Sequence, residues 1–526
     1  MTLAERAQDA PGRLAFEVDG EGIGYRQLAG RASRVASALV KAGVAPGDHC
    51  AVALPTSLDF ITLFYALSWM GAVPVAISPE LQAREMAARL ACAGCKALFS
   101  VTAVLENVAN LPDAGSKAAS VALLDAGTLR KHATRSPHPL HRGSADETAY
   151  LQFTSGTTGE ARAAVILNRN LQASLESATS LLAFGPSDVF AGTIPLHHNF
   201  GLVRFVWAPV HAGASCHLAT SSAGGVFLWL ALMTHNKATT TAGPDFLYRA
   251  AARRGDPTLA NLRALRVASN GGEAVHLDTI EAFERHFGVL GTVRPGYGLT
   301  EATLGVCTMA PGLPLRSLDD GTVSCGRPMP GVEVRVANED GVELRRGTRG
   351  ALLVRGPSVF AGYLGDPEGT RDVLRDGWLW TGDEAAMDAD GFVYVTGRQR
   401  ALIKRAGSPV LPASIERAVD QLIDVERSAA VGVPDRAAGT ERIVVLAEVR
   451  DPALASRAAA AKAVARSIAA AAQAASGHQP GEIILVSPGT LPRTGSGKIK
   501  HAELRGIVER GEVERRLAVI TRLGRD

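Results

Sequence analysis

The sequence has little net charge, few cysteines and no long apolar run. Its 55 basic and 52 acidic side chains leave a net charge of +3 over 526 residues. That charge is too small to indicate nucleic acid or an anionic membrane surface as a partner. No signal-peptide core follows Met1, and no uncharged apolar run reaches the roughly 18 residues that a membrane-spanning helix needs. We therefore expect a cytoplasmic protein without nucleic-acid binding or stable membrane insertion.

Cysteine usage gives no indication of a redox centre. The chain has six cysteines, and only Cys92 and Cys95 form a C-x-x-C pair. This pair lies where a helical pattern gives way to an expected strand at residues 96–99, without the other features of a thioredoxin-like site. The pattern predicts a protein of a reducing compartment.

The first part of the chain alternates helical patterns with short apolar strands. Helices are expected at residues 28–42 and 59–70, and buried strands at 50–54 and 73–77. This alternation is typical of a parallel sheet covered by helices. The loop-rich stretch 107–146 is expected to be a linker.

Further along, Asn170 is expected to cap a helix that ends near Leu182. Residues 354–395 are expected to form a β-rich lobe because short strands there are separated by Gly, Asp and Pro. A smaller unit follows, with a helix at 413–422, strands at 429–433 and 443–449, and an Ala-rich surface helix within 455–476. The predicted fold class is α/β. A large N-terminal domain of helix-covered, mostly parallel sheets plus the β-rich lobe spans 1–399, and a small mobile α+β domain spans 400–526.

One loop has the composition of a phosphate site. The stretch Thr154-Ser-Gly-Thr-Thr-Gly159 joins expected strands at 150–153 and 164–167. Glycines let a backbone come close to a ligand, and turn N–H groups with hydroxyls suit phosphate oxygens. A solvated hairpin loop is the alternative for these residues alone. The loop is not a Walker A motif, because the G-x-x-x-x-G-K-[ST] spacing is absent and a strand follows.

Five further stretches accompany this loop. They are Pro195-Leu-His-His-Asn-Phe-Gly201, Asn270-Gly-Gly-Glu-Ala274, Tyr297-Gly-Leu-Thr-Glu301, Trp380-Thr-Gly-Asp383 with Thr396-Gly-Arg398, and Leu491-Pro-Arg-Thr-Gly-Ser-Gly-Lys-Ile-Lys500. In order and spacing the set resembles the adenylate-forming (AMP-binding) superfamily, which includes acyl-CoA synthetases and fatty acyl-AMP ligases. The resemblance covers about residues 25–504.

The resemblance implies a site for ATP and Mg²⁺. The implied ATP-binding residues are Thr154, Ser155, Gly156, Thr157, Thr158, Gly159, Arg162, Gly272, Glu273, Tyr297, Gly298, Thr300, Asp383, Arg398 and Lys498. By resemblance, Tyr297 lies on the adenine, Thr300 contacts the α-phosphate and Glu301 is the metal ligand, a hard oxygen donor that suits Mg²⁺. Asp383 and Arg398 resemble the ribose-binding pair. The alternatives are a plain turn for Asp383 and a favourable helix N-terminus for Glu301.

The implied catalytic residues are Lys498, Thr300, Glu301 and His198. Attack of a carboxylate on the α-phosphate brings two anionic groups together, and a cation that bridges them stabilises the transition state. Lys498 resembles that cation, with a generic surface lysine as the alternative. Arg400 occupies the position of the family's hinge, about which the small domain rotates.

The implied acyl pocket is formed by His198, Asn199, Phe200, Val203, Gly243 and Pro244. His198 could be an acid–base group or a gate of the acyl pocket, and the gate is favoured. The resemblance implies two half-reactions, in which ATP and a carboxylic acid, expected to be a fatty acid, give an acyl-adenylate and pyrophosphate, and a thiol then attacks. Some stretches resemble fatty acyl-AMP ligases, which load carrier proteins, and others resemble CoA ligases. The phosphopantetheine of an acyl carrier protein is slightly favoured over free CoA.

Two departures from the family's pattern keep another class of function open. Where relatives usually have Gly-Lys-Pro-Lys-Gly, this chain has Gly159-Glu-Ala-Arg-Ala163. Arg162 would have to replace a lysine. Glu160 adds an unfavourable charge beside phosphates, and Ala163 stands where relatives usually have a glycine. A catalytically impaired nucleotide-binding relative is therefore the alternative from a different class.

Overall fold

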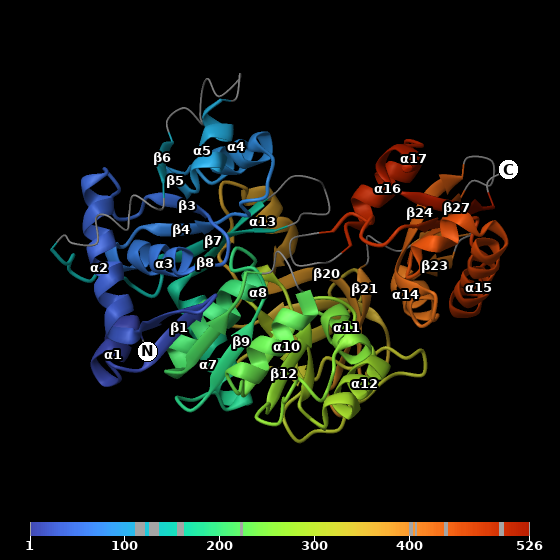
Figure 1. The fold of residues 1–526 in the computed structure, drawn as a ribbon, viewed down its shortest axis with the longest axis horizontal. Helices are drawn as coiled ribbons and strands as arrows, with labels where there is room; N and C mark the ends of the chain where they lie inside the picture. The colour runs from blue at the N-terminus through green and yellow to red at the C-terminus, as the bar shows by residue number, and fades with distance from the viewer. Residues whose placement is uncertain are drawn as a thin grey trace.

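The computed structural model describes residues 2–110, 121–125, 136–154, 162–220, 225–398, 403–405, 408–435, 440–493 and 499–524. Figure 1 shows a large body built from the first three quarters of the chain, with the C-terminal unit beside it. None of the helices in these ranges has the length and apolar character needed to cross a membrane.

Two mostly parallel sheets form the large body. The seven-stranded sheet has the order β18-β8-β7-β4-β3-β5-β6. Its strands are β3 His49–Ala53, β4 Val73–Ala76, β5 Ala97–Ser100, β6 Ala122–Asp125, β7 Thr148–Thr154, β8 Arg162–Leu167 and β18 Gly362–Tyr363. The pairs among β3, β4, β5, β6 and β7 are parallel, and β7 pairs antiparallel with β8. The predicted parallel sheet is thus confirmed.

The nine-stranded sheet has the order β15-β14-β13-β12-β11-β9-β10-β1-β2. Its strands are β1 Leu14–Val18, β2 Glu21–Gly24, β9 Val189–Gly192, β10 Ser215–Leu218, β11 Thr240–Gly243, β12 Val267–Gly271, β13 Val293–Gly298, β14 Gly305–Thr308 and β15 Arg327–Pro328. Its centre, from β1 to β13, is parallel, and antiparallel strands close both edges.

Helices cover these two sheets (Figure 1). The main ones are α1 Leu3–Asp9, α2 Tyr25–Lys41, α3 Leu58–Met70, α4 Ala83–Cys92, α5 Thr102–Ala109, α7 Asn168–Leu182, α10 Gly225–His235, α11 Asp245–Arg254 and α12 Leu277–Phe287. The α3 helix is apolar on nearly every face and belongs to a core that includes residues from both sheets. A helix that is apolar all round must be buried, and α3 therefore joins the two sheets.

A third, antiparallel sheet forms the predicted β-rich lobe. Its strands are β16 Glu333–Ala337, β17 Gly350–Arg355, β19 Leu374–Arg375, β20 Trp378–Met387 and β21 Val393–Arg398, with the short helix α13 Pro367–Val373 beside them. Residues Asp383 and Arg398 face each other as register partners on β20 and β21.

The C-terminal unit has a sheet of its own, with the order β24-β25-β26-β27. The strands are β24 Val425–Asp435, β25 Thr440–Val449, β26 Glu482–Val486 and β27 Val519–Leu523, and the helices are α14 Pro412–Asp420, α15 Ala458–Ser476, α16 His501–Glu509 and α17 Val513–Arg516. Separate apolar clusters cover the two faces of this sheet. The remaining ribbon is β22 Ile403–Arg405 with β23 Ser408–Val410.

The structure corrects two local predictions. Asn170 is not the cap of α7, because the helix begins at Asn168, and the Asn170 side chain instead accepts a hydrogen bond of 3.0 Å from the Leu167 N–H. The stretch 107–146 is not only a linker, since Ala122–Asp125 forms the parallel edge strand β6 on β5. A four-residue strand among loop residues has too short a pattern to stand out in the sequence.

Candidate functional site

A cavity of about 580 Å³ lies where the three sheets of the large body meet. It is lined by the ends of β7, β12, β13 and β20, by α7, and by the helical segment that starts at Asn199. Crevices beyond the carboxyl ends of parallel strands are the usual ligand sites of α/β folds. The predicted residues Thr154, Arg162, Gly272, Tyr297, Gly298, Thr300, Glu301 and Arg398 all line this cavity.

Asp383 is not among the described residues that line the cavity, but Tyr297 and Arg398, which do line it, both contact its side chain. Asp383 is buried, and the Tyr297 hydroxyl donates a hydrogen bond to its Oδ2 atom. The Arg398 guanidinium lies 2.8 Å from its Oδ1 atom. The Asp383 charge raises the pKa of Arg398, and burial raises the pKa of Tyr297 well above its usual value. The three predicted side chains therefore meet, and we call them the Asp383 group.

Glu301 lies on a short 3-10 turn, Thr300–Ala302, next to the Asp383 group. Tyr363 of β18 donates a 2.8 Å hydrogen bond to its Oε1 atom. The next residue but one, Thr303, is buried with a positive φ of 64°. Asn199 donates to the Thr303 carbonyl, and the Thr303 hydroxyl donates to Ser358 O at 2.7 Å. A non-glycine residue held at positive φ is strained, and such strain clusters at functional sites.

The described residues contain no cluster of three or more His, Cys, Asp or Glu side chains that could hold a metal ion. A site built on Glu301 alone fits Mg²⁺ only together with oxygens from a ligand. That is how Mg²⁺ is usually bound in nucleotide enzymes, through one or two carboxylates plus phosphates.

Arg162 begins β8, and its guanidinium is shared between two neighbours. Its Nε atom lies 3.1 Å from Asp366 Oδ2, and the group stands 5.3 Å from the centre of the Tyr363 ring. Ser155, Gly156, Thr157, Thr158 and Gly159 lie outside the described residues, as do Arg400 and Lys498. Their predicted roles stay predictions.

Glu273, a predicted ATP-binding residue, is not among the described residues that line the cavity, and its side chain contacts the backbone of α11. Its half-buried side chain accepts a 2.7 Å hydrogen bond from the Phe246 N–H, and removal of the carboxyl from water raises its pKa. Gly272 beside it lines the cavity with a φ of 88°, a conformation that favours glycine.

On the other side of the cavity, the predicted acyl-pocket residues His198, Asn199, Phe200 and Val203 are brought together. They lie on α8, Asn199–Leu202, its cap His198, and the π-helical turn Val203–Trp207 labelled η2, which continues into α9, Ala208–Ala212. Asn199 is also tied to β7, because the Tyr150 hydroxyl donates to its Oδ1 atom at 2.9 Å. Within the described part of the chain, Gly243 and Pro244 are not among the residues that line this cavity.

Two residues that the motifs did not single out also line the cavity, Tyr363 and Arg204. Tyr363 lies far from Glu301 in the sequence and carries no local signal. Arg204 could have been noticed, because it is the one charged residue in the run Phe200–Val206.

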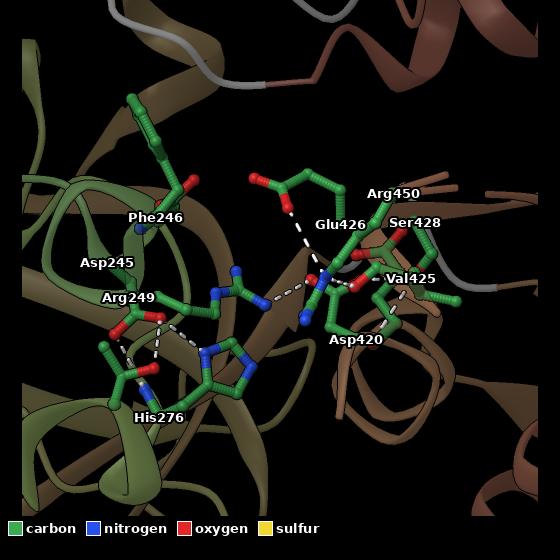
Figure 2. Close-up of polar contacts among 12 residues, drawn as sticks. Asp245, Phe246, Arg249, His276, Asp420, Val425, Glu426, Ser428 and Arg450 are labelled. Atoms are coloured by element: carbon green, nitrogen blue, oxygen red, sulfur yellow. Dashed lines mark hydrogen bonds and ion pairs between the residues drawn. The ribbon is translucent and has the colours of Figure 1, made fainter. Parts of the chain in front are cut away.

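The C-terminal unit contacts the large body through charged side chains. One of these pairs, Arg249 with Asp420, is labelled in Figure 2. Arg249 of α11 lies 2.9 Å from Asp420 at the end of α14, and Arg254 lies 3.0 Å from Glu426 of β24. The Arg427 guanidinium stacks 4.4 Å from the centre of the Phe246 ring. These contacts between the two parts of the molecule are made by charged and aromatic side chains.

The anchor of α11 connects this interface to the cavity. Its first residue, Asp245, is fully buried and accepts hydrogen bonds from Asn270 at 3.0 Å and from the His276 ring at 2.8 Å (Figure 2). Asn270 itself lines the cavity. A hydrogen-bonded network of this kind fixes α11 relative to β12.

Residues 491–493 are held by a buried carboxylate. Glu448 of β25 accepts a 2.9 Å hydrogen bond from Leu491 N–H and also contacts the Arg493 guanidinium. Arg493 and Ile499 form an antiparallel bridge. The two flanks of the stretch 494–498 therefore lie side by side on the small sheet.

A model of the AMP-binding enzyme family matches residues 3–364. The chain belongs to the AMP-binding enzyme family. Its relatives identify it as an adenylate-forming ligase, and its fold is that of the ATP-binding, adenylate-forming enzymes.

Curated relatives of this AMP-binding enzyme include both kinds of ligase. A long-chain-fatty-acid–AMP ligase, FadD26, of Mycobacterium marinum is 30% identical, over 95% of this chain and 95% of that protein. A feruloyl-CoA synthase of Amycolatopsis sp is 30% identical over 82% of this chain and 84% of its own length. A long-chain-fatty-acid–CoA ligase of Salmonella typhimurium is 28% identical over 86% and 85%.

Solved structures show the same fold. ATP-bound MatB from Rhodopseudomonas palustris is similar with a TM-score of 0.81 and 26% identity, over 97% of this chain and 99% of that one. A structure from a study of fatty acyl-adenylate ligases from E. coli and L. pneumophila has a TM-score of 0.85 at 24% identity, over 98% of both chains. At that identity, the second likeness speaks for the fold alone.

Proposed function

We propose that this enzyme uses ATP to convert a carboxylic acid into an acyl-adenylate with release of pyrophosphate, and then transfers the acyl group to a phosphopantetheine thiol. A fatty acid is the expected substrate. The observation that carries the proposal is one cavity in which the Asp383 group, the Thr300–Glu301 turn and an acyl-type wall converge.

The Asp383 group supports binding of a nucleoside. Asp383 is oriented by Arg398 and Tyr297, and a carboxylate has lone pairs enough to accept two more hydrogen bonds from ribose hydroxyls. The Tyr297 ring lines the cavity with Gly271, Gly272 and Gly296, whose lack of side chains leaves room for a flat base. Adenine is therefore assigned to this side.

Thr300 and Glu301 would meet the phosphates. The Thr300 hydroxyl can donate to an α-phosphate oxygen, and Glu301, held by Tyr363, would hold Mg²⁺ together with phosphate oxygens. A bound Mg²⁺ would neutralise charge that develops on the phosphates. To contact the same phosphates, the Arg162 guanidinium would have to break its ion pair with Asp366 or bind both groups at once.

Lys498 would supply the cation of the first transition state. It lies five residues after Arg493, whose place is fixed by Glu448. Because the same space must later admit a thiol, the small domain, proposed to begin at 400, would rotate about Arg400. The ion pairs between the two parts of the molecule support such a movement, since they can be exchanged for water more easily than an apolar interface.

The proposal also concerns which molecule supplies the acceptor thiol. A carrier-protein phosphopantetheine is favoured because the most fully covered relative among those named above is an acyl-AMP ligase. Free CoA is the second candidate, favoured by the CoA ligases and CoA synthase among the relatives. A direct comparison of CoA with a holo-carrier protein, under equal adenylate turnover, separates the two.

Pyrophosphate release over a panel of carboxylic acids tests the first half-reaction, with the acyl-adenylate identified by mass spectrometry. The Asp383→Asn variant tests whether this release depends on the Asp383 group, because the change keeps the size of the side chain and removes its charge. Release by the native chain that is reduced in the variant would support the proposal. ATP binding without pyrophosphate from any acid would instead assign a nucleotide-binding relative without turnover.

A further inference from the structure

A buried arginine lines the cavity on the side away from the ATP motifs. Arg204 is 4% exposed and lines the cavity together with Leu175, Ala178 and Leu182 of α7. It lies on the π-helical turn η2, between the buried side chains of Val203 and Phe205. π-helical turns inside helices are frequent at functional sites.

Among the described residues, no carboxylate forms an ion pair with Arg204. Its Nη2 atom donates to Thr240 Oγ1 at 2.7 Å and to the Thr241 carbonyl at 3.3 Å. Its Nε atom is buried without a hydrogen-bond partner. A guanidinium carries five N–H donors, so these two contacts leave part of its donor capacity unused.

Asp188, a carboxylate whose charge acts on Arg204, is already in contact with other side chains. Arg266 holds both oxygens of Asp188, with Nε at 2.8 Å from Oδ1 and Nη2 at 2.5 Å from Oδ2. Thr239 donates to the same carboxylate at 2.6 Å. Asp188 is therefore paired with Arg266, and among the described side chains it forms no ion pair with Arg204.

Aromatic rings compensate part of the buried charge. The Arg204 guanidinium lies 4.4 Å from the centre of the Phe184 ring and 5.3 Å from that of Phe190. Burial lowers the pKa of Arg204 to about 10, so the group remains charged at neutral pH. Buried charges in proteins are normally paired, because an isolated one is strongly unfavourable.

We propose that Arg204 is a specificity-determining residue, and that the acid substrate carries a second oxygen-bearing group in its tail which pairs with it. The inference rests on the proposed function, in which this side of the cavity holds the acyl chain. The apolar wall of α7 would cover the aliphatic part of the chain, and the cation would receive its polar group. A second carboxylate is the expected best ligand, since it is the group that neutralises the cation, and a hydroxyl is the weaker one.

The experiment compares three acids of equal length, ending in a methyl, a hydroxyl or a carboxylate, over a range of chain lengths. Pyrophosphate release gives kcat/KM for each acid with the native enzyme and with Arg204→Met and Arg204→Lys. We expect the native enzyme to prefer the dicarboxylic acid over the methyl acid by about 10- to 100-fold, the range of one hydrogen bond to a charged group. Arg204→Met should lose that preference and Arg204→Lys should keep part of it.

Arg31→Met is the matched control, because Arg31 pairs with Asp59 at 2.6 Å and does not line the cavity. It should leave the ratio between the three acids unchanged. A native enzyme that prefers methyl acids at every length would overturn the inference and leave the proposed function standing. So would an Arg204→Met variant that slows all three acids equally at an unchanged melting temperature, since Arg204 would then be a structural cation. Absence of pyrophosphate with every acid would refute the proposed function itself.

Discussion

The Asp383 group and the surroundings of Arg204 lie at two sides of one cavity and differ in whether their charged side chains are paired. Asp383 is in contact with Arg398 and Tyr297, and Arg162 nearby is in contact with Asp366. Arg204 has threonine and aromatic neighbours and, within the described chain, no ion pair. A charge that is already paired gains less when a ligand binds, because it has to share or exchange its partner. An unpaired buried charge gains most when a ligand supplies the opposite charge, so the first side is suited to a constant ligand and the second to a selective one.

The largest loss of activity should follow from a change at Lys498, which we expect to act on the nucleotide and not on the acyl chain. Lys498→Ala should lower the rate of acyl-adenylate formation about 10²–10³-fold, the usual cost of one charge-stabilising group in a transition state. Thiol attack on a supplied acyl-adenylate should stay nearly normal. Rapid-quench measurement of each half-reaction checks this, and an equal loss in both would make Lys498 a structural residue.

Asp383→Asn should have the next largest effect. The change removes the charge that Arg398 and Tyr297 contact and weakens each hydrogen bond that a ribose would make. A hydrogen bond to a charged group contributes about 1.5–3 kcal/mol, so kcat/KM for ATP should fall about 10- to 100-fold. The selectivity between acids should not change, because Arg204 is untouched. A changed ratio between acids, measured by pyrophosphate release, would show that the two sides are coupled.

Arg162→Ala should have a smaller effect, on ATP alone. The guanidinium is shared with Asp366 and the Tyr363 ring, so only part of its charge is available to phosphates. We expect the KM for ATP to rise several-fold and the KM for the acid to stay nearly constant. Steady-state kinetics with each substrate varied in turn is the measurement. An unaltered KM for ATP would mean that other groups hold the phosphates.

The smallest effect is expected from the contacts between the large body and the C-terminal unit. Arg249→Met breaks the ion pair with Asp420 that is drawn in Figure 2, and should alter the balance between the half-reactions less than threefold. Arg254→Met is the matched control, because its pair with Glu426 is more exposed and exposed pairs contribute only about 0–1 kcal/mol. A large loss in one half-reaction for Arg249→Met alone would make this pair part of the domain movement.

Much of the site followed from the sequence because its motifs are local. Tyr297, Thr300 and Glu301 lie within one strand end and one turn, so their mutual placement depends on a few backbone angles. The resemblance predicts Asp383 and Arg398 at the same ribose, and the register of β20 with β21 makes the two residues partners. The alternation of helices and strands could be predicted for the same reason, since strand and helix periods are properties of short segments.

Other features depend on residues that are distant in the chain. Tyr363 reaches Glu301 only because β18 adds to the edge of β8, and Glu273 is engaged by the Phe246 N–H across the start of α11. The sequence alone determined the composition of the nucleotide motifs and the order of helices and strands. Only the tertiary structure decided that Asp188 is occupied by Arg266 and that Arg204 is buried without an acid among the described residues. Pairing and burial are set by packing between segments, and no local pattern in the chain encodes them.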